Sequence, residues 1–322
     1  MAELTIVKPP IPDALHRLSD DFLAHVRAQG RALKTSESYR YPLERVFLPW
    51  CVEQGITEPT QLSSRVLDRF ALHLREEADQ RVGQDGRRLG KLSEASISSY
   101  SRSIRVFLRW AEKEGELTEK VRMPVPKPKK PELEVLSAEE IQRMEDAARS
   151  ERDELLVRVL ADTGIRLGEL LGLRARDLLE TDRGKYRLRV SGKTGERRVP
   201  VPPALARRLG RHLSRRHADP SDKIFVALRR SRRTGDYEPL TENGAEQAVR
   251  QLADAAGIRR RVYPHLFRHS YATNALRKGM SVLNLQQILG HASLTMISQV
   301  YAHLSDDDTY EAAMKVLLPE ER

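Results

Sequence analysis

One short segment of the chain combines a histidine and an arginine at a spacing that suits phosphate chemistry. In the string Pro264–Ser270, His265 and Arg268 are three residues apart, so on a helix they share one face. An arginine neutralises the charge of a phosphate, and a histidine donates a hydrogen bond or moves a proton. The pattern His-x-x-Arg is common by itself, so a functional interpretation needs support from the rest of the chain.

A second arginine lies in a segment bracketed by glycines. Arg166 is flanked by Gly164 and Gly168, where one predicted helix ends and the next begins. Arg166 should therefore project from a turn, with Glu169 placed to orient it or to balance its charge. An ordinary surface ion pair is the simpler alternative. The leucines around the segment favour burial, where an unpaired arginine is costly, so we interpret Arg166 as functional.

Three further candidates are a lysine, a histidine and a tyrosine. Lys193 lies in a turn that contains two glycines. His291 follows Gly290, which is the expected end of a helix, and Tyr301 comes ten residues after His291. Each has an ordinary explanation when taken singly, because turn lysines are usually exposed and a tyrosine in apolar surroundings usually belongs to a core.

Taken together, the candidates meet the needs of phosphodiester transfer without a metal. Cations and hydrogen-bond donors stabilise the charge that grows on the phosphate, a tyrosine can form a covalent intermediate, and an acid can protonate the leaving oxygen. No acidic cluster indicates a Mg²⁺ site, and no G-x-x-x-x-G-K-[ST] loop is present. We therefore expect no metal and no cofactor. The six candidates are Arg166, Lys193, His265, Arg268, His291 and Tyr301.

Two regions joined by a proline-rich segment must position these side chains. Four prolines fall within residues 124–131, together with Lys127, Lys129 and Lys130, and such a segment favours an extended strap. It divides the chain into residues 1–120, a linker of residues 121–135, and residues 136–322.

The first region is predicted to be all-helical. Apolar residues recur at helical spacing in four segments, 13–29, 35–54, 64–77 and 93–113, and Ser93 is the predicted N-cap of the last. Four helices of this length make a small bundle.

The second region is predicted to combine helices with a small β-hairpin, so the whole chain is mainly α with a minor β component, of the α+β class. Ser137 and Glu140 form a capping-box pattern at the start of a helix. We expect a hairpin of residues 186–190 and 197–201, and a short strand at 223–227. Helices are expected at 138–149, 152–163, 167–172, 203–216, 241–256, 265–278, 281–289, 293–301 and 307–317.

The chain is basic and rich in arginine. It has 56 Lys plus Arg against 46 Asp plus Glu, a net charge of +10, and only 13 of the 56 are Lys. A polyanionic partner such as a nucleic acid fits this balance, although a solvated basic surface would also produce it. Residues 197–233 hold 12 basic and two acidic residues, a stretch that we expect to contact the DNA backbone. The candidate DNA contacts are Lys127, Lys129, Lys130, Arg229, Arg230, Arg232 and Arg233.

Cysteine content and hydropathy bear on location. The single cysteine, Cys51, lies in an apolar stretch and is predicted to be a core residue, so no internal disulfide is possible. No apolar run approaches the length of a membrane span, and the N-terminus lacks the apolar region of a secretory signal. We expect a cytoplasmic protein without membrane contact, associated with the nucleoid if the source is bacterial.

The order of the six candidates resembles the tyrosine recombinase family, which includes the phage integrases, Cre and the bacterial Xer proteins. Thr163–Leu173, the segment around His265, and Leu289–His291 are similar to the three signature boxes of that family. The likeness spans nearly the whole chain. The first region resembles the SAM-like core-binding domain and the second the catalytic domain. About a dozen residues precede the first helix, which leaves no room for an arm-binding domain and favours a Xer-type or Cre-type architecture.

This resemblance implies a role for each candidate. Tyr301 would attack the scissile phosphate and form a 3′-phosphotyrosyl link, and Lys193 would protonate the leaving 5′-oxygen. The phosphate would be held by Arg166, Arg268 and His291, with His265 assisting by proton transfer or hydrogen bonding and Glu169 supporting the site. A homo-tetramer, or a hetero-tetramer with a paralogue, would exchange strands between two DNA sites through a Holliday junction.

The sequence departs from the family pattern at one point. Tyr301 comes ten residues after His291, where nine is usual in the family. Tyr310 is the only later tyrosine, and we reject it as the nucleophile because Asp306–Asp308 would repel phosphate. Two alternatives stay open: a DNA-binding or architectural protein on a degenerate recombinase fold, and a relative of the type IB topoisomerases or telomere resolvases. Three biological tasks also stay open: chromosome-dimer resolution, plasmid resolution and element integration.

Overall fold

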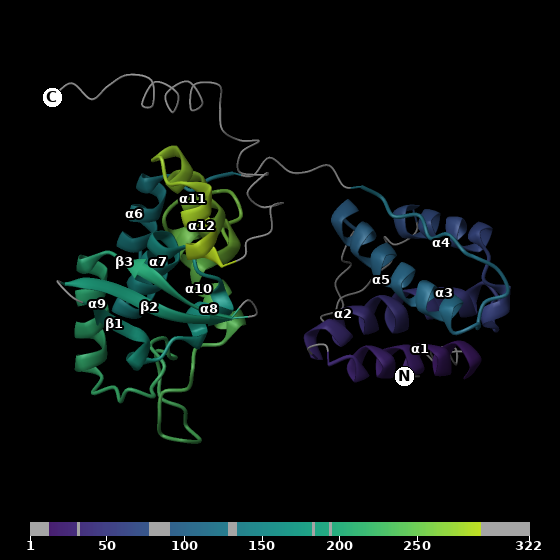
Figure 1. Cartoon of the computed structure of the whole chain (residues 1–322), viewed down its shortest axis with the longest axis horizontal. Helices are drawn as coiled ribbons and strands as arrows, with labels where there is room; N and C mark the ends of the chain where they lie inside the picture. The colour runs from purple at the N-terminus through teal and green to yellow at the C-terminus, as the bar shows by residue number, and fades with distance from the viewer. Residues whose placement is uncertain are drawn as a thin grey trace, which may run out of the picture. The chain divides into compact units, whose positions relative to one another are not determined.

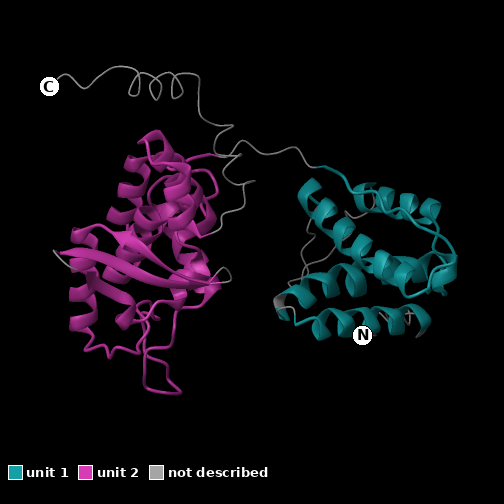
Figure 2. Cartoon of the chain, in the orientation of Figure 1, with its two compact units in different colours: residues 1–131 teal, residues 132–322 magenta. Residues whose placement is uncertain are grey.

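The computed structural model describes residues 13–30, 33–76, 91–127, 134–181, 184–192 and 195–290. The chain divides into two compact units, residues 1–131 and 132–322, which are coloured separately in Figure 2. The division falls inside the proline- and lysine-rich segment. Lys127 is exposed, whereas Lys129 and Lys130 lie outside the described residues.

The first unit consists of helices, labelled in Figure 1. They are α1 (Asp13–Ala28), α2 (Leu33–Pro42), a π-helical turn (Leu43–Phe47), α3 (Leu48–Glu53), a 3₁₀ turn (Pro59–Gln61), α4 (Ser64–Glu76) and α5 (Glu94–Lys113). The segment predicted as one helix at 35–54 is continuous from α2 to α3, but its hydrogen bonding changes after Pro42. Pro42 has no N–H to donate within the helix. The turn that follows it is π-helical, and Leu48 donates to the oxygen of Leu43, five residues back.

An aromatic cluster fills the core of this unit. The ring of Phe22 lies 5.5 Å, centroid to centroid, from the rings of Tyr39, Phe107 and Trp110. Cys51 is buried in the same core, as predicted, and burial raises the pKa of its thiol to about 12. The cysteine is therefore a packing residue and not a reactive thiol.

The second unit packs its helices around a small sheet (Figure 1). Its elements are α6 (Ala138–Asp146), α7 (Glu151–Thr163), α8 (Leu167–Gly172), a 3₁₀ turn (Ala175–Asp177), β1 (Leu178–Thr181), β2 (Lys185–Gly192), β3 (Gly195–Val201), α9 (Pro203–Arg215), α10 (Glu242–Ala255), α11 (Pro264–Arg277) and α12 (Val282–Leu289). The helices predicted at 293–301 and 307–317 lie outside the described residues.

The sheet is antiparallel, with strand order β1-β2-β3. Its register pairs Tyr186 with Val201 and Gly192 with Gly195, so the predicted hairpin is confirmed and its turn falls at the expected glycines. The sequence did not predict β1, which is only four residues long. The strand predicted at 223–227 is wrong, because this segment forms only two isolated bridges, from Lys223 to Arg174 and from Val226 to Pro239.

Both predicted helix caps are confirmed. Ser93 accepts a hydrogen bond from the backbone N–H of Ser96 at the start of α5. Ser137 and Glu140 form the reciprocal capping box at the start of α6. Within the described ranges, no helix has both the length and the apolar character needed to cross a membrane.

Candidate active site

The turn between α7 and α8 presents Arg166. Gly164 ends α7 with a φ of +60°, and a Cβ at this position would lie 2.6 Å from the ring of Tyr271, so the position requires glycine on two counts. Arg166 then forms the N-cap of α8 in an extended conformation. Its side chain keeps 32% of its surface exposed, which leaves it accessible to a ligand.

Glu169 holds Arg166 in place from the first turn of α8. The carboxylate accepts a hydrogen bond of 2.8 Å from the backbone N–H of Arg166 and one of 3.1 Å from its Nη1. Burial alone would raise the pKa of Glu169, but its hydrogen bonds and the neighbouring arginines outweigh burial and lower the pKa. Glu169 is therefore ionised near neutral pH.

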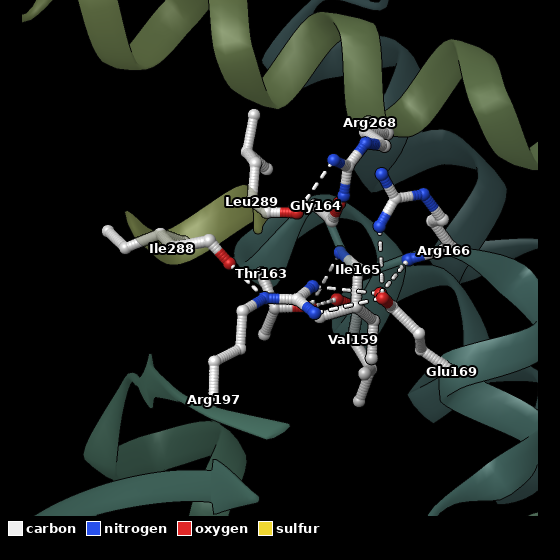
Figure 3. Close-up of polar contacts among 10 residues, drawn as sticks. All are labelled: Val159, Thr163, Gly164, Ile165, Arg166, Glu169, Arg197, Arg268, Ile288 and Leu289. Carbon is white, nitrogen blue, oxygen red and sulfur yellow. Dashed lines mark hydrogen bonds and ion pairs between the residues drawn. The ribbon is translucent and has the colours of Figure 1, made fainter. Parts of the chain in front are cut away.

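Arg268 lies on α11 and is almost fully buried, with 2% of its surface exposed. Its Nη1 donates to the backbone oxygen of Gly164 at 2.9 Å, and its Nη2 donates to that of Leu289 at 2.7 Å. Figure 3 shows both contacts. Burial lowers the pKa of Arg268 to about 10, and the charge of Arg166 contributes to this shift. With that pKa Arg268 stays protonated at neutral pH. A bound anion would stabilise its buried positive charge.

His265 lies almost one helical turn before Arg268 on α11. Its side chain reaches solvent at the surface, yet desolvation by the protein around it lowers its pKa, and Arg268 and Arg166 lower it further. At neutral pH His265 is therefore uncharged and can accept a proton.

Sequence reasoning missed one residue of this cluster. Arg197, on β3, pairs with both oxygens of Glu169, with Nη1 and Nη2 each at 2.8 Å, and its Nε donates to the backbone oxygen of Ile288 at 2.6 Å. In the sequence Arg197 belongs to the basic stretch expected to contact DNA, and nothing near it indicates a partner 28 residues away. The geometry in Figure 3 places it inside the site instead.

The charges of this cluster do not cancel. Arg166, Arg197 and Arg268 carry three positive charges against the one negative charge of Glu169. Arg268 forms no ion pair among the described residues. The positive charges of Arg268 and Arg166 repel each other. A bound anion would relieve this, and a phosphodiester or its doubly charged transition state matches the surplus.

Two of the three remaining candidates for chemistry follow directly on described residues. Lys193 comes after the last residue of β2, Gly192, and His291 comes after Gly290, just beyond α12. Lys193, His291 and Tyr301 themselves lie outside the described residues, as does Tyr310. Within the described part of the chain, no three His, Cys, Asp or Glu side chains are grouped as metal ligands.

The basic stretch 197–233 does not form one continuous cationic surface. Arg208 pairs with Glu145 and Glu154, and Arg215 pairs with Glu151. Arg216 donates to backbone oxygens of a neighbouring loop. In contrast, the four arginines predicted as DNA contacts at the far end of the stretch are exposed: Arg229, Arg230, Arg232 and Arg233.

Comparison with known proteins gives one consistent result. Residues 134–308 match the profile of the phage integrase family. The chain is 27% identical to tyrosine recombinase XerA of Saccharolobus solfataricus, covering 81% of this chain and 80% of that protein. It is 29% identical to XerA of Pyrococcus furiosus, covering 94% of each. Among solved structures, XerH recombinase bound to its palindromic difH substrate, in a post-cleavage complex, has the same fold, with a TM-score of 0.67 at 21% identity over 94% of this chain and 84% of that one.

Proposed function

Because this chain belongs to the phage integrase family, we propose that it is a site-specific DNA recombinase that cleaves and rejoins DNA through a covalent bond to Tyr301. One observation carries the proposal beyond family membership. Arg166 and Arg268 come together from different helices, and with Arg197 they outnumber the one described carboxylate of the cluster, Glu169, so a positive charge is left over. Such a pair is suited to the non-bridging oxygens of a phosphodiester.

The proposed reaction conserves the energy of the phosphodiester bond. The oxygen of Tyr301 attacks the scissile phosphorus, forms a 3′-phosphotyrosyl bond and expels the 5′-oxygen, which takes a proton from Lys193. Arg166 and Arg268 stabilise the transition state, and His291 supplies a further donor. His265, neutral at pH 7, assists by proton transfer or hydrogen bonding. The reverse reaction with a 5′-hydroxyl from another strand exchanges the strands, without metal or nucleotide.

The proposed partner is double-stranded DNA carrying recombination sites. The XerH recombinase structure is of that protein bound to its palindromic difH substrate, and the net charge of +10 favours a polyanion. We assign backbone contacts to the exposed arginines at 229–233 and to Lys127, Lys129 and Lys130. The assembly is proposed to be a tetramer on two sites, of identical chains or with a paralogue, acting at the nucleoid through a Holliday junction.

Covalent trapping tests this proposal. The protein is incubated with nicked suicide DNA sites drawn from its genomic neighbourhood, denatured, and examined for a DNA-linked species. An adduct that is lost in Tyr301→Phe and retained in Tyr310→Phe is the expected result. An adduct retained in Tyr301→Phe would overturn the assignment of the nucleophile.

Trapping, together with a supercoil-relaxation assay and a two-site recombination assay, separates the alternatives. Absence of any adduct on DNA that the protein demonstrably binds would favour a DNA-binding protein on a degenerate recombinase fold. An adduct accompanied by relaxation of supercoils, but without recombination between two sites, would favour a topoisomerase-like enzyme.

A further inference from the structure

The carboxylate of Glu169 has four hydrogen-bond donors. Its Oε1 accepts from Nη1 of Arg166 at 3.1 Å and from Nη1 of Arg197 at 2.8 Å. Its Oε2 accepts from the backbone N–H of Arg166 and from Nη2 of Arg197, both at 2.8 Å. Glu169 is buried and Arg197 is nearly so, with side-chain exposures of 4% and 11%. A two-point ion pair of this geometry, shielded from water, is held far more firmly than a surface pair.

Arg197 also joins three elements of the site. It projects from β3, binds Glu169 on α8, and donates through Nε to Ile288 in the last turn of α12. Gly290, which ends α12, packs directly on the guanidinium, since a Cβ there would lie 3.1 Å from the Cδ, Nε and Cζ atoms of Arg197. The hairpin strand, the helix that begins at Arg166 and the end of α12 therefore meet at this one side chain.

The negative charge of Glu169 explains why a second arginine, Arg197, is needed beside it. A phosphate that binds Arg166 must compete with this carboxylate for the guanidinium, and a buried negative charge close to a phosphate raises the energy of the transition state. Arg197 supplies two of the donors and one compensating charge. Glu169 can then hold the backbone and one nitrogen of Arg166 without neutralising it.

We infer that Arg197 is a positioning residue for DNA strand cleavage, which fixes and neutralises Glu169 so that Arg166 and Arg268 are free to take the scissile phosphate. This inference rests on the proposed function. It assigns to Arg197 no contact with the DNA, so its loss should reduce the rate of cleavage and leave the affinity for DNA nearly unchanged.

Single-turnover formation of the covalent adduct on a nicked suicide site tests the inference, alongside the Kd for the same DNA and the urea midpoint of each variant. Arg197→Gln leaves Glu169 charged with Arg166 as its only remaining cation partner in the described part of the chain, and it should slow adduct formation roughly 10- to 100-fold. The double variant Glu169→Gln/Arg197→Gln removes both charges, and it should react about tenfold faster than Arg197→Gln. Arg197→Lys keeps the charge but loses the two-point geometry, and it should fall between wild type and Arg197→Gln.

Arg260→Gln is the matched control. Arg260 makes the same kind of two-point pair with Glu140 and also donates to a backbone oxygen, that of Val135, but it has no contact with Glu169 or Arg166. It should react at the wild-type rate. If Arg197→Gln is unfolded, the rates of adduct formation by wild type, Arg197→Lys and the double variant are compared in its place, and these rates test the inference.

The outcomes are distinct. A double variant no faster than Arg197→Gln would show that Arg197 is only a structural support and would overturn the inference, as would Arg197→Gln reacting at the wild-type rate. A wild-type protein that forms no adduct would instead overturn the proposed function, and the inference with it.

Discussion

The Nη2 of Arg268 donates a hydrogen bond of 2.7 Å to the backbone oxygen of Leu289, so that α11 holds the last residue of α12. The same guanidinium holds Gly164 at the end of α7. Two helix ends, whose carbonyl groups lack partners within their own helices, are therefore satisfied by one cation. Arg268 is part of the fold as well as a candidate for binding phosphate.

We expect Arg268→Ala to lower the free energy of unfolding by about 1–2 kcal/mol, because both carbonyl oxygens lose their donor while the cost of burying a cation is relieved. Urea unfolding measures this. Arg211→Ala is the control, since Arg211 is an exposed residue of α9 and should change stability by less than about 0.5 kcal/mol. Equal midpoints for the two variants would show that the contacts of Arg268 do not stabilise the fold.

A second prediction concerns Gly192. A Cβ at this position would lie 2.7 Å from Oε1 of Glu169, which is itself held by two arginines. Gly192→Ala should therefore displace Glu169, cost about 1–3 kcal/mol and slow adduct formation. Gly210→Ala is the control: Gly210 lies within α9, nothing beyond its chain neighbours and the local helix backbone lies within 4 Å of the added Cβ, and alanine should stabilise by up to about 1 kcal/mol. An active, fully stable Gly192→Ala would contradict this account.

The third prediction concerns the protonation of His265. Its pKa lies below the ordinary 6.5 because of desolvation first and the charges of Arg268 and Arg166 next. Arg166→Gln removes one positive neighbour, which favours the charged imidazole, so the pKa should rise but stay below 6.5 while burial and Arg268 remain. NMR titration of the imidazole in the free protein measures both values, with Arg211→Gln as control. A wild-type midpoint at or above 6.5 would refute the prediction.

The fourth prediction separates exposed from paired arginines in the basic stretch. Replacing Arg229 and Arg232 by Gln should reduce the slope of log Kd against log salt by about 0.9 for each phosphate that the variant no longer neutralises. Arg208→Gln should leave that slope unchanged and instead destabilise the fold, because Arg208 pairs with Glu145 and Glu154. Binding isotherms at several salt concentrations measure the slopes. Equal slopes in all variants would remove 229–233 from the DNA interface.

Local features were the part of the structure that the sequence determined. The capping box of Ser137 and Glu140, the hairpin turn at Gly192 and Gly195, and the helical placement of His265 with Arg268 follow from interactions between residues a few positions apart. Such interactions depend on the chain's own backbone geometry, and a pattern of residues is enough to specify them. The family resemblance likewise rested on short motifs, each of which is local.

Only the tertiary structure decided which charges meet. Arg197 reaches Glu169 across 28 residues and Ile288 across 91, and Arg208 reaches Glu145 across 63. No periodicity in the sequence predicts contacts between residues so far apart along the chain. Such ion pairs depend on how helices and strands pack and on which arginines that packing buries. In the sequence, Arg197 and Arg229 belong to one basic stretch. In the fold, burial makes the first a partner of Glu169, and exposure leaves the second available to a polyanion.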